Sequence, residues 1–518
     1  MEKSEAIQRL VEKYAAYLEE KQASQKNTEE KIHVDEIASK VAAFYEKVRN
    51  LIDYREEHLL RKGIIERILR RRMFLKNFEK NFAEPLIKEL IRSGHLPNDT
   101  VPESKIADIQ KIIDALVHLM EHSVFKNESE KKEAYDWLVA INVSAVEEEL
   151  FAPEKERMLS AAMFSVVRQA LEVRNAELSD EKKDIQLFIA IQRALFRSDQ
   201  DQLQYRLLKF IQPQWGIHES GEEGNVIIET KRHLTALLKD PVGRSFFRLC
   251  NRQKIVFLLI GDLVFGGAQM EEGFESSIKS AYQDRYKKEK SQFYRLAFFS
   301  VISFFISKIL VAFAVEIPID KYFSHELSMQ TTIINIALPP LLMLLIVFFI
   351  RLPSKQNYYL VAGEVKNVVF PIEHKNYVVT VPKKRGFASE AFVHLAYLTT
   401  LIVVVYFLTK TLITIDFSPA SIVIFLLFTS MVIATGVRIN NRAKEISLMK
   451  EKPTVLSFIG DLIAVPFMTI GRWAITGLGK FNILVVAFNF LIELPFQLFV
   501  EFLENFRSFI KAKKEESD

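Results

Sequence analysis

Cysteine and glycine are scarce in this chain, and their scarcity excludes several classes of protein. Its 518 residues include one cysteine, Cys250, so no disulfide can form within the chain, and no Cys/His cluster has zinc-finger spacing. Seventeen glycines against 41 phenylalanines are typical of bulky helical packing rather than of a turn-rich β architecture. The net charge is only +4, so we expect no nucleic-acid partner.

Motifs for catalysis or cofactor binding are also missing from the sequence. Neither GxxxxGK[ST] nor a GxGxxG after a strand occurs, and HExxH and GxSxG are absent. We therefore expect no cofactor, no catalytic residues and no metal site. The sequence favours a protein that is not an enzyme, without deciding the point.

Long apolar runs are what the chain does contain. Four nearly uncharged stretches occur in the carboxyl-terminal half, at 296–315, 333–350, 395–415 and 420–437. Each approaches or reaches the length of about 20 residues that a helix needs to cross a bilayer. The sequence thus predicts an all-α, polytopic helical membrane protein, with a transmembrane domain over residues 291–437.

The distribution of Lys and Arg predicts the topology of these four spans. Successive connecting segments hold six (276–295), one (316–330), seven (351–390), one (Lys410) and five (438–452) basic residues. Basic residues accumulate in cytoplasmic loops. We therefore expect a multi-pass protein of the cell membrane with both termini in the cytoplasm. The start, MEKSEAIQRLVEKY, has no apolar core that would mark a secretory signal.

The region 438–518 allows two interpretations. Residues 455–475 and 483–503 are apolar but contain Pro466, Glu493 and other polar residues, and the chain ends in a basic tail. They form either interfacial or re-entrant helices or two further spans. Because both ends are expected in the cytoplasm, the total is four spans in the first case and six in the second.

Residues 1–290 predict a large helical cytosolic domain. Apolar residues from Ile37 to Leu51 recur every three or four positions, and Ser104 and Ser179 stand where helix N-caps are expected. Loops at 95–104 and 216–225 suggest internal boundaries. The run Ile255–Ala268 is too short and too polar for a span, so we expect a buried core helix there.

The cytosolic loop 351–390, between the second and third spans, differs from its surroundings. The runs YYLVA, VKNVVF and NYVVTV are β-branched or aromatic and are separated by Gly, Glu, Pro and Asn. They predict a small β-hairpin or meander, which we expect to dock on the amino-terminal helices.

Ionisable and polar residues within the apolar runs are the main site candidates, because lipid penalises them unless they find partners. Lys308, Glu316 and Asn335 are predicted to cluster where spans one and two meet, with Lys308 paired to Glu316 or Asn335. With Glu493 they make up a candidate polar path. The alternative is a structural polar contact with Lys308 reaching toward the surface.

A basic stretch at 61–80 is the second candidate site. Arg67, Arg70, Arg71 and Arg72 lie within it and are candidates for contact with anionic lipid, although the default interpretation of such a stretch is an ordinary solvated helix face.

Three functions are consistent with these features. We expect a non-catalytic membrane scaffold or anchoring protein that contacts the lipid bilayer, and other proteins through residues 1–290. The first alternative is a transporter or channel-like protein, and the second is a membrane enzyme that acts on lipid or peptide.

Overall fold

The computed structural model of the chain divides into two compact units. It describes residues 3–26, 30–34, 57–74, 82–92, 94–196, 198–213, 215, 224–268, 273–323, 329–350, 352–353, 355–371, 375–382, 386–448 and 455–478. The amino-terminal unit combines Met1–Tyr282 with Tyr358–Lys383, and the apolar unit combines Gln283–Asn357 with Lys384–Asp518. Each unit therefore contains two separate pieces of the chain.

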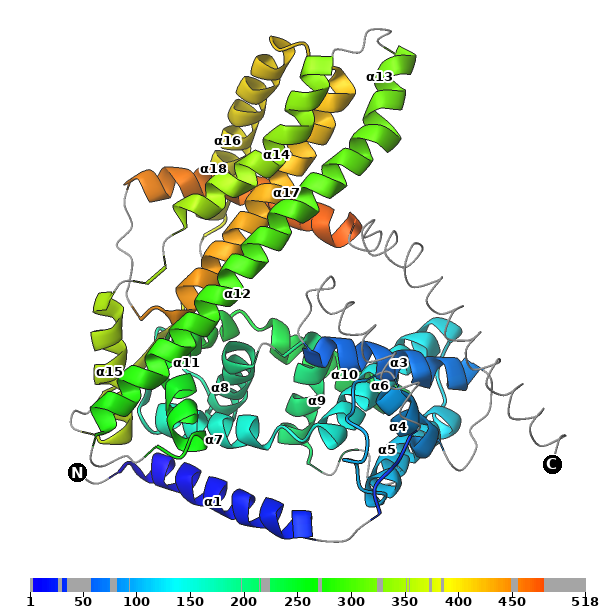
Figure 1. Cartoon of the computed structure of the whole chain (residues 1–518), viewed down its shortest axis with the longest axis vertical. Helices are drawn as coiled ribbons and strands as arrows, with labels where there is room; N and C mark the ends of the chain where they lie inside the picture. Colours follow the sequence, from blue (N-terminus) through cyan, green and yellow to red (C-terminus); the bar gives the residue numbers. More distant parts are fainter. Residues whose placement is uncertain are drawn as a thin grey trace, which may run out of the picture. The chain divides into compact units, whose positions relative to one another are not determined.

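The amino-terminal unit is helical apart from two short strands (Figure 1). Its elements are α1 (Glu5–Lys26), α3 (Glu57–Phe74), α4 (Ala83–Arg92), α5 (Ser104–His122), α6 (Glu128–Leu150), α7 (Glu154–Gln169), β1 (Leu171–Arg174), α8 (Asp180–Leu195), α9 (Gln200–Ile211), α10 (Gly224–Lys239), α11 (Gly243–Phe265), the start of α12 (Phe274–Val311), most of α15 (Lys355–Val369) and β2 (Tyr377–Thr380). Helix α6 packs against α3, α5, α9 and α10, and its side chains form much of the core.

Local signals explain several helix boundaries in this unit. Ser179 caps α8, because its side chain accepts a hydrogen bond from the backbone N–H of Lys182 at 3.2 Å, as predicted. The prediction for Ser104 was wrong by one position. Glu103 precedes α5, has φ −62° and ψ −29°, and makes no side-chain cap bond, so Ser104 is already the first helical residue.

Other predictions for this half are confirmed in part. The stretch 95–103 lies between α4 and α5 outside any helix, as predicted. Helix α11 buries Ile255, Phe257 and Ile260 in the core, as expected for the run 255–268. Helix α10 already begins at Gly224, so the last two residues of the predicted loop at 216–225 are helical, and residues 216–223 lie outside the described residues. The predicted helix from Ile37 to Leu51 also lies outside them.

The segment between the second and third apolar runs is built differently from the predicted hairpin or meander. Residues 355–369, which include two of the three β-like runs, form helix α15. Val361, Val365 and Val368 are buried in it at spacings of four and three, so their burial follows the helical period rather than the strand period. β-branched residues alone did not distinguish the two periods, and the hairpin prediction was wrong.

The third run does form a strand, but its partner lies in the amino-terminal half. Strand β2 pairs in parallel with β1, with Leu171 opposite Tyr377 and Arg174 opposite Thr380. The Ser245 hydroxyl donates to the carbonyl of Thr380 at 3.0 Å. The segment 358–383 is thus part of the amino-terminal unit, as the expected docking required.

The apolar unit contains the four candidate membrane spans. It comprises the rest of α12, a π-helix η1 (Ala312–Glu316), α13 (Ile317–Phe323), α14 (Met329–Phe349), α16 (Phe387–Ile413), α17 (Pro419–Ala443), a 3-10 turn η2 (Lys444–Ile446) and α18 (Val455–Leu478). Phe274–Tyr322, Thr331–Phe349, Phe387–Ile413 and Pro419–Ala443 are long and apolar enough to cross a membrane. The prediction of a mostly helical chain with four candidate spans is confirmed at this level.

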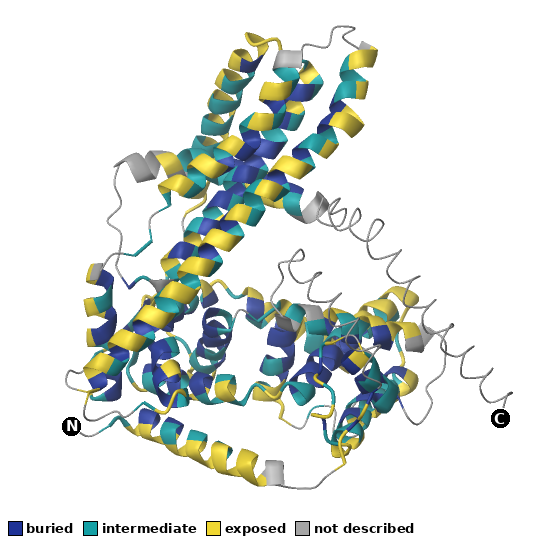
Figure 2. Ribbon diagram, in the orientation of Figure 1, coloured by how far each residue is buried: buried dark blue, intermediate teal, exposed yellow. Residues whose placement is uncertain are grey.

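Exposure of these helices agrees with a lipid surrounding. In the most apolar 18-residue window of α16, no residue is buried, and Leu395, Phe407 and Ile413 are each more than half exposed (Figure 2). In water such a continuous apolar surface would be unfavourable, whereas hydrocarbon accommodates it.

Helix α18 contains the predicted segment 455–475 and runs across α14, α16 and α17 rather than alongside them (Figure 1). It packs on α16 and α17. Phe467, Gly471 and Ala474 form its buried face, while Trp473 is 72% exposed. The predicted segment 483–503 lies outside the described residues.

Gly471 brings the backbones of α18 and α17 into close contact. A Cβ atom at this position would lie 2.0 Å from the carbonyl oxygen of Ser430 and 2.9 Å from the Cβ of Ala434. We expect Gly471→Ala to destabilise the apolar unit by about 1–3 kcal/mol, because the two helices must move apart. The free energy of unfolding in bicelles measures this. Gly460→Ala is the control on the same helix, since its Cβ would meet nothing within 4 Å. Equal stability of the two variants would contradict the close contact.

Candidate polar site between apolar helices

Three of the four predicted intramembrane candidates form one hydrogen-bonded cluster in the apolar unit. The Lys308 ammonium contacts the Glu316 carboxylate at Oε1, and the Asn335 amide nitrogen donates to Oε2 of the same carboxylate at 2.8 Å. The three side chains are 0%, 3% and 2% exposed. The structure thus joins Lys308, Glu316 and Asn335 into a triad, while Glu493 lies outside the described residues.

The π-helix η1 explains how Glu316 reaches Lys308. Eight residues of regular α-helix would leave the two side chains about 80° apart around the axis. The N–H of Ile317 instead bonds to the carbonyl of Ala312, five residues back. This wider turn rotates less per residue and brings Glu316 back toward the face of Lys308.

Pro318 is the local reason for this irregular turn. It lies two residues after Glu316, the last residue of η1, and has no N–H to donate to the carbonyl of Ala314, four residues earlier. The pattern Glu-x-Pro at the end of an apolar helix therefore places both a charge and a helix irregularity at one point.

An aromatic ring and a second group of hydrogen bonds lie close to the triad. The Lys308 nitrogen lies 5.2 Å from the centre of the Phe428 ring, a cation–π distance. One turn after Glu316, Asp320 accepts hydrogen bonds from the hydroxyls of Ser418 and Ser421 at the start of α17. The sequence did not predict this second link, because the two serines lie about 100 residues from Asp320 and look like ordinary helix-capping residues.

Two polar atoms near the triad are not satisfied within the described residues. Oδ1 of Asn335 and the hydroxyl of Thr429, next to Phe428 in the chain, are buried without a hydrogen-bond partner there. Buried polar atoms normally have a partner. The triad itself is neutral as a set and holds its charges in an ion pair, so it offers no free nucleophile.

Two of the four arginines that were predicted to contact lipid form ion pairs within the amino-terminal unit. Arg70 pairs with Glu66 and Asp136 at 2.8 and 2.7 Å, and Arg71 binds Glu89 at 2.8 Å. Arg67 is exposed, and the side chain of Arg72 lies outside the described part of the structure. At least two of the four arginines therefore use their charge within the amino-terminal unit.

A buried ion network in the same unit was not anticipated. Glu147 and Glu148 of α6 are 4% and 5% exposed. Arg61 binds Glu147 at 2.8 Å, and Glu148 binds Arg206 at 2.5 Å and Arg157 at 3.1 Å. Adjacent glutamates in an otherwise apolar part of a helix were the available signal. Fully paired charges of this kind indicate a structural network.

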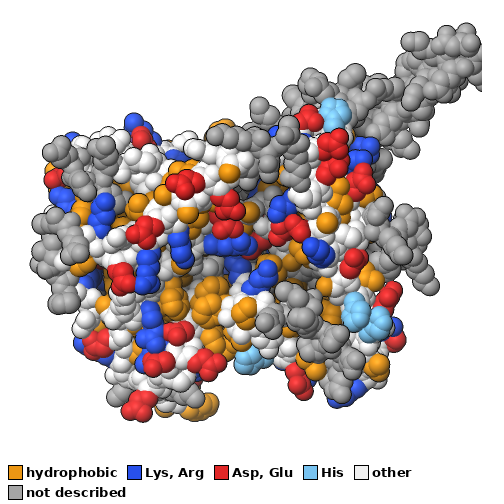
Figure 3. Space-filling view, turned by 90° about the horizontal axis from the view of Figure 1, so that it is seen from below, with side chains coloured by type: hydrophobic (Ala, Val, Ile, Leu, Met, Phe, Trp, Pro, Cys, Tyr) orange, Lys and Arg blue, Asp and Glu red, His pale blue; other side chains and the backbone are white. Residues whose placement is uncertain are grey.

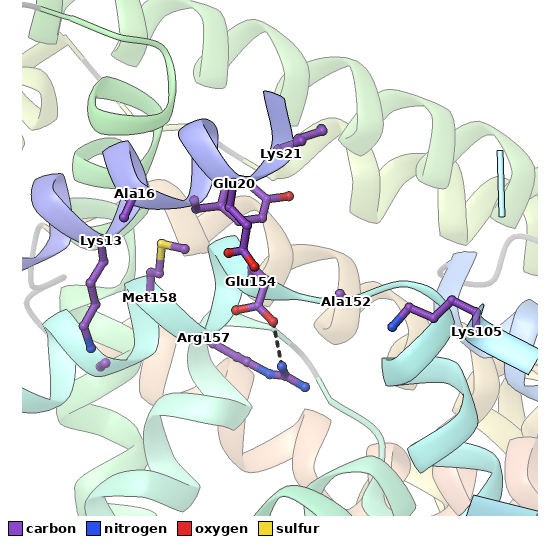
Figure 4. Close-up of a pocket in the computed structure, with 11 residues that line it drawn as sticks. Lys13, Ala16, Glu20, Lys21, Lys105, Ala152, Glu154, Arg157 and Met158 are labelled. Carbon is purple, nitrogen blue, oxygen red and sulfur yellow. Dashed lines mark hydrogen bonds and ion pairs between the residues drawn. The ribbon is translucent and has the colours of Figure 1, made fainter. Parts of the chain in front are cut away.

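A cavity in the amino-terminal unit lies between α1 and the start of α7. It has a volume of about 880 Å³ and mixes charges of both signs over apolar residues, as the sticks in Figure 4 show. The residues that line it are Lys13, Ala16, Tyr17, Glu20, Lys21, Lys105, Ala152, Glu154, Arg157, Met158 and Ala161. Figure 3 looks onto the side that carries α1, where Lys and Arg alternate with Asp and Glu. This mixture indicates no single ligand class.

No catalytic or metal centre emerges from the part of the chain that the structure describes. Among those residues, no three His, Cys, Asp or Glu side chains are grouped so that they could hold a metal ion. Comparison with protein-family models, with curated proteins and with solved structures finds no match.

Proposed function

We propose that this protein is a non-catalytic, multi-pass membrane protein that anchors a helical interaction domain at the cytoplasmic face of the cell membrane. The observation that supports it most is the incorporation of segment 358–383 into the amino-terminal unit. The chain connects this unit to the apolar helices through α12, through the start of α15 and through the residues that lead from β2 to α16. Three covalent connections suit a domain with a fixed place at the membrane.

Strand pairing supports the proposed topology. Residues 171–174 and 377–380 belong to one sheet, so both lie in the same compartment. The chain between them contains two candidate spans, Phe274–Tyr322 and Thr331–Phe349. These two helices then cross in opposite directions. With two further crossings by α16 and α17, the region after α17 lies on the same side as the amino-terminal unit. The basic residues of the segments on that side favour the cytoplasm.

The amino-terminal unit offers an aromatic surface for a protein partner. Phe210 is 41% exposed and stacks on Phe188, with ring centres 4.3 Å apart. Phe164 lies next to it at 6.2 Å. Exposed, rigidly stacked aromatic side chains are common anchors of protein interfaces.

A photo-crosslinking experiment in intact cells tests the anchoring function. A photoreactive residue at Phe210 of the full chain is expected to form a discrete adduct with another protein, and Phe188→Ser in the same chain is expected to remove that adduct. The same photoreactive residue at Val124, which is 77% exposed elsewhere in the unit, is the control. Equal adducts from both positions, or none from either, would contradict a specific interaction surface here.

The second candidate function is a transporter or channel-like protein in which the triad lines a polar path. Two features favour it: the buried ion pair beside a π-helix, and the Asn335 oxygen, which has no hydrogen-bond partner among the described residues. Intramembrane charges often mark such paths. It predicts that proteoliposomes containing the protein carry an ion or solute flux that Glu316→Gln abolishes while the protein still assembles. Absence of any flux from the unaltered protein argues for anchoring alone.

A further inference from the structure

Helix α11 carries a stripe of three exposed arginines, Arg244, Arg248 and Arg252. Their spacing of four residues places them on one side of the helix over a length of about 12 Å. On the other side, Phe246 and Cys250 are completely buried in the amino-terminal unit. The helix is therefore fixed in rotation, and its arginines point away from the core.

The charge of this stripe is not balanced by bound carboxylates, in contrast to that of Arg70 and Arg71 in α3. Among the described residues, no carboxylate forms an ion pair with any of its three members. Arg248 donates to the Arg244 carbonyl at 3.4 Å and to the Ser245 hydroxyl at 3.3 Å, and both of these acceptors are neutral. The acid nearest in sequence, Asp240, is bound to Lys182 at 2.8 Å.

A short stretch of chain links the strand bound to this stripe with the start of the third candidate span. Ser245, between the first two arginines, is hydrogen-bonded to the carbonyl of Thr380. Helix α16 begins seven residues later, at Phe387. Seven extended residues reach at most about 25 Å. The intervening sequence adds Lys383, Lys384 and Arg385.

We propose that the arginine stripe of α11 binds the phosphate groups of anionic lipids in the cytoplasmic leaflet. The guanidinium group binds phosphate through two parallel hydrogen bonds, and an anionic surface attracts basic residues held near a membrane helix. The inference rests on the proposed membrane function, because it requires α16 to enter a bilayer. It adds a lipid-class specificity and orients α11 at the membrane surface.

Fluorescence quenching in nanodiscs tests the inference on the full chain. The variant with Cys250→Ser and Asn251→Cys carries a fluorophore beside the stripe, and a trace lipid carries a nitroxide on its headgroup. Quenching is expected to be stronger when phosphatidylglycerol is added to phosphatidylcholine. Each basic residue near an anionic surface strengthens binding to that surface by a factor of about five. Changing all three arginines to Gln should therefore lower the equilibrium constant for binding of α11 to the lipid surface about a hundredfold. Changing all three to Lys should retain most of it.

A matched variant separates the stripe from general electrostatics. Lys126, Lys132 and Lys239 are exposed in the same unit, and changing all three to Gln removes the same charge. This control should keep the phosphatidylglycerol effect. Identical quenching in both lipid mixtures, or an equal loss in the control, would overturn the proposal. The proposal would also be overturned if a short RNA bound the stripe in phosphatidylcholine nanodiscs while phosphatidylglycerol had no effect on quenching. Failure of the chain to enter nanodiscs would instead contradict the membrane function itself.

Discussion

Replacing Lys308 by leucine is expected to destabilise the apolar unit by about 3–5 kcal/mol. The change leaves the Glu316 carboxylate 3% exposed, with Asn335 as its remaining hydrogen-bond donor among the described residues. An uncompensated charge in a buried site costs more than the lost hydrogen bond alone. Unfolding by SDS in bicelles gives the free energy, and the yield of monodisperse protein gives an independent readout.

The double variant with leucine at both Lys308 and Glu316 provides the control. It removes both charges, and apolar replacement of a complete buried ion pair is often tolerated. We expect it to be more stable than Lys308→Leu, with a residual cost from Asn335, which then lacks its acceptor. If the two changes simply add, Lys308 and Glu316 do not interact as the structure shows. A double variant that is stable but loses a measured flux would favour transport.

Removing the segment between the second and third candidate spans is expected to open the amino-terminal unit. Val361, Val365, Tyr377 and Val379 are each 5% exposed or less, and burial of such side chains contributes about 1.5–3 kcal/mol each. Their sum approaches the whole stability of a typical domain. A Gly/Ser linker of equal length in place of residues 358–381 should therefore unfold the unit in the full chain.

Cys250 provides the measurement for this prediction. It is the single cysteine of the chain, and burial raises the pKa of its thiol, so maleimide should label it slowly in the folded protein. The linker variant should be labelled at the rate of the denatured chain. Within α15, Val361→Ser with Val365→Ser should speed labelling, whereas Tyr359→Ser with Leu360→Ser, at positions 73% and 50% exposed, should not. Slow labelling of the linker variant would show that the amino-terminal helices fold without the segment.

The sequence alone was enough to predict some features of this structure. The four apolar helices, the cap at Ser179 and the buried helix at 255–265 follow from composition and spacing over short stretches, and local signals of that kind are readable in the chain. Lys308, Glu316 and Asn335 were also recognisable, because a polar residue inside an apolar run stands out.

Their arrangement was not recognisable in the same way. The position of Glu316 relative to Lys308 depends on the π-helix, and the position of Asn335 depends on how α14 packs. The predicted lipid-binding role of the arginines at 67–72 depended on their neighbours as well. Asp136 and Glu89, from α6 and α4, neutralise two of them, while Arg244, Arg248 and Arg252 drew no attention in the sequence.

The amino-acid sequence alone determined where apolar helices form and which of them are long enough to cross a membrane, because hydrophobicity and helix periodicity act over about 20 neighbouring residues. Only the tertiary structure decided that strand 377–380 pairs with strand 171–174, which ions neutralise one another, and where Gly471 lets two helices touch. Such contacts join residues far apart in the chain. Their energy depends on distances of a few ångströms that no local pattern encodes.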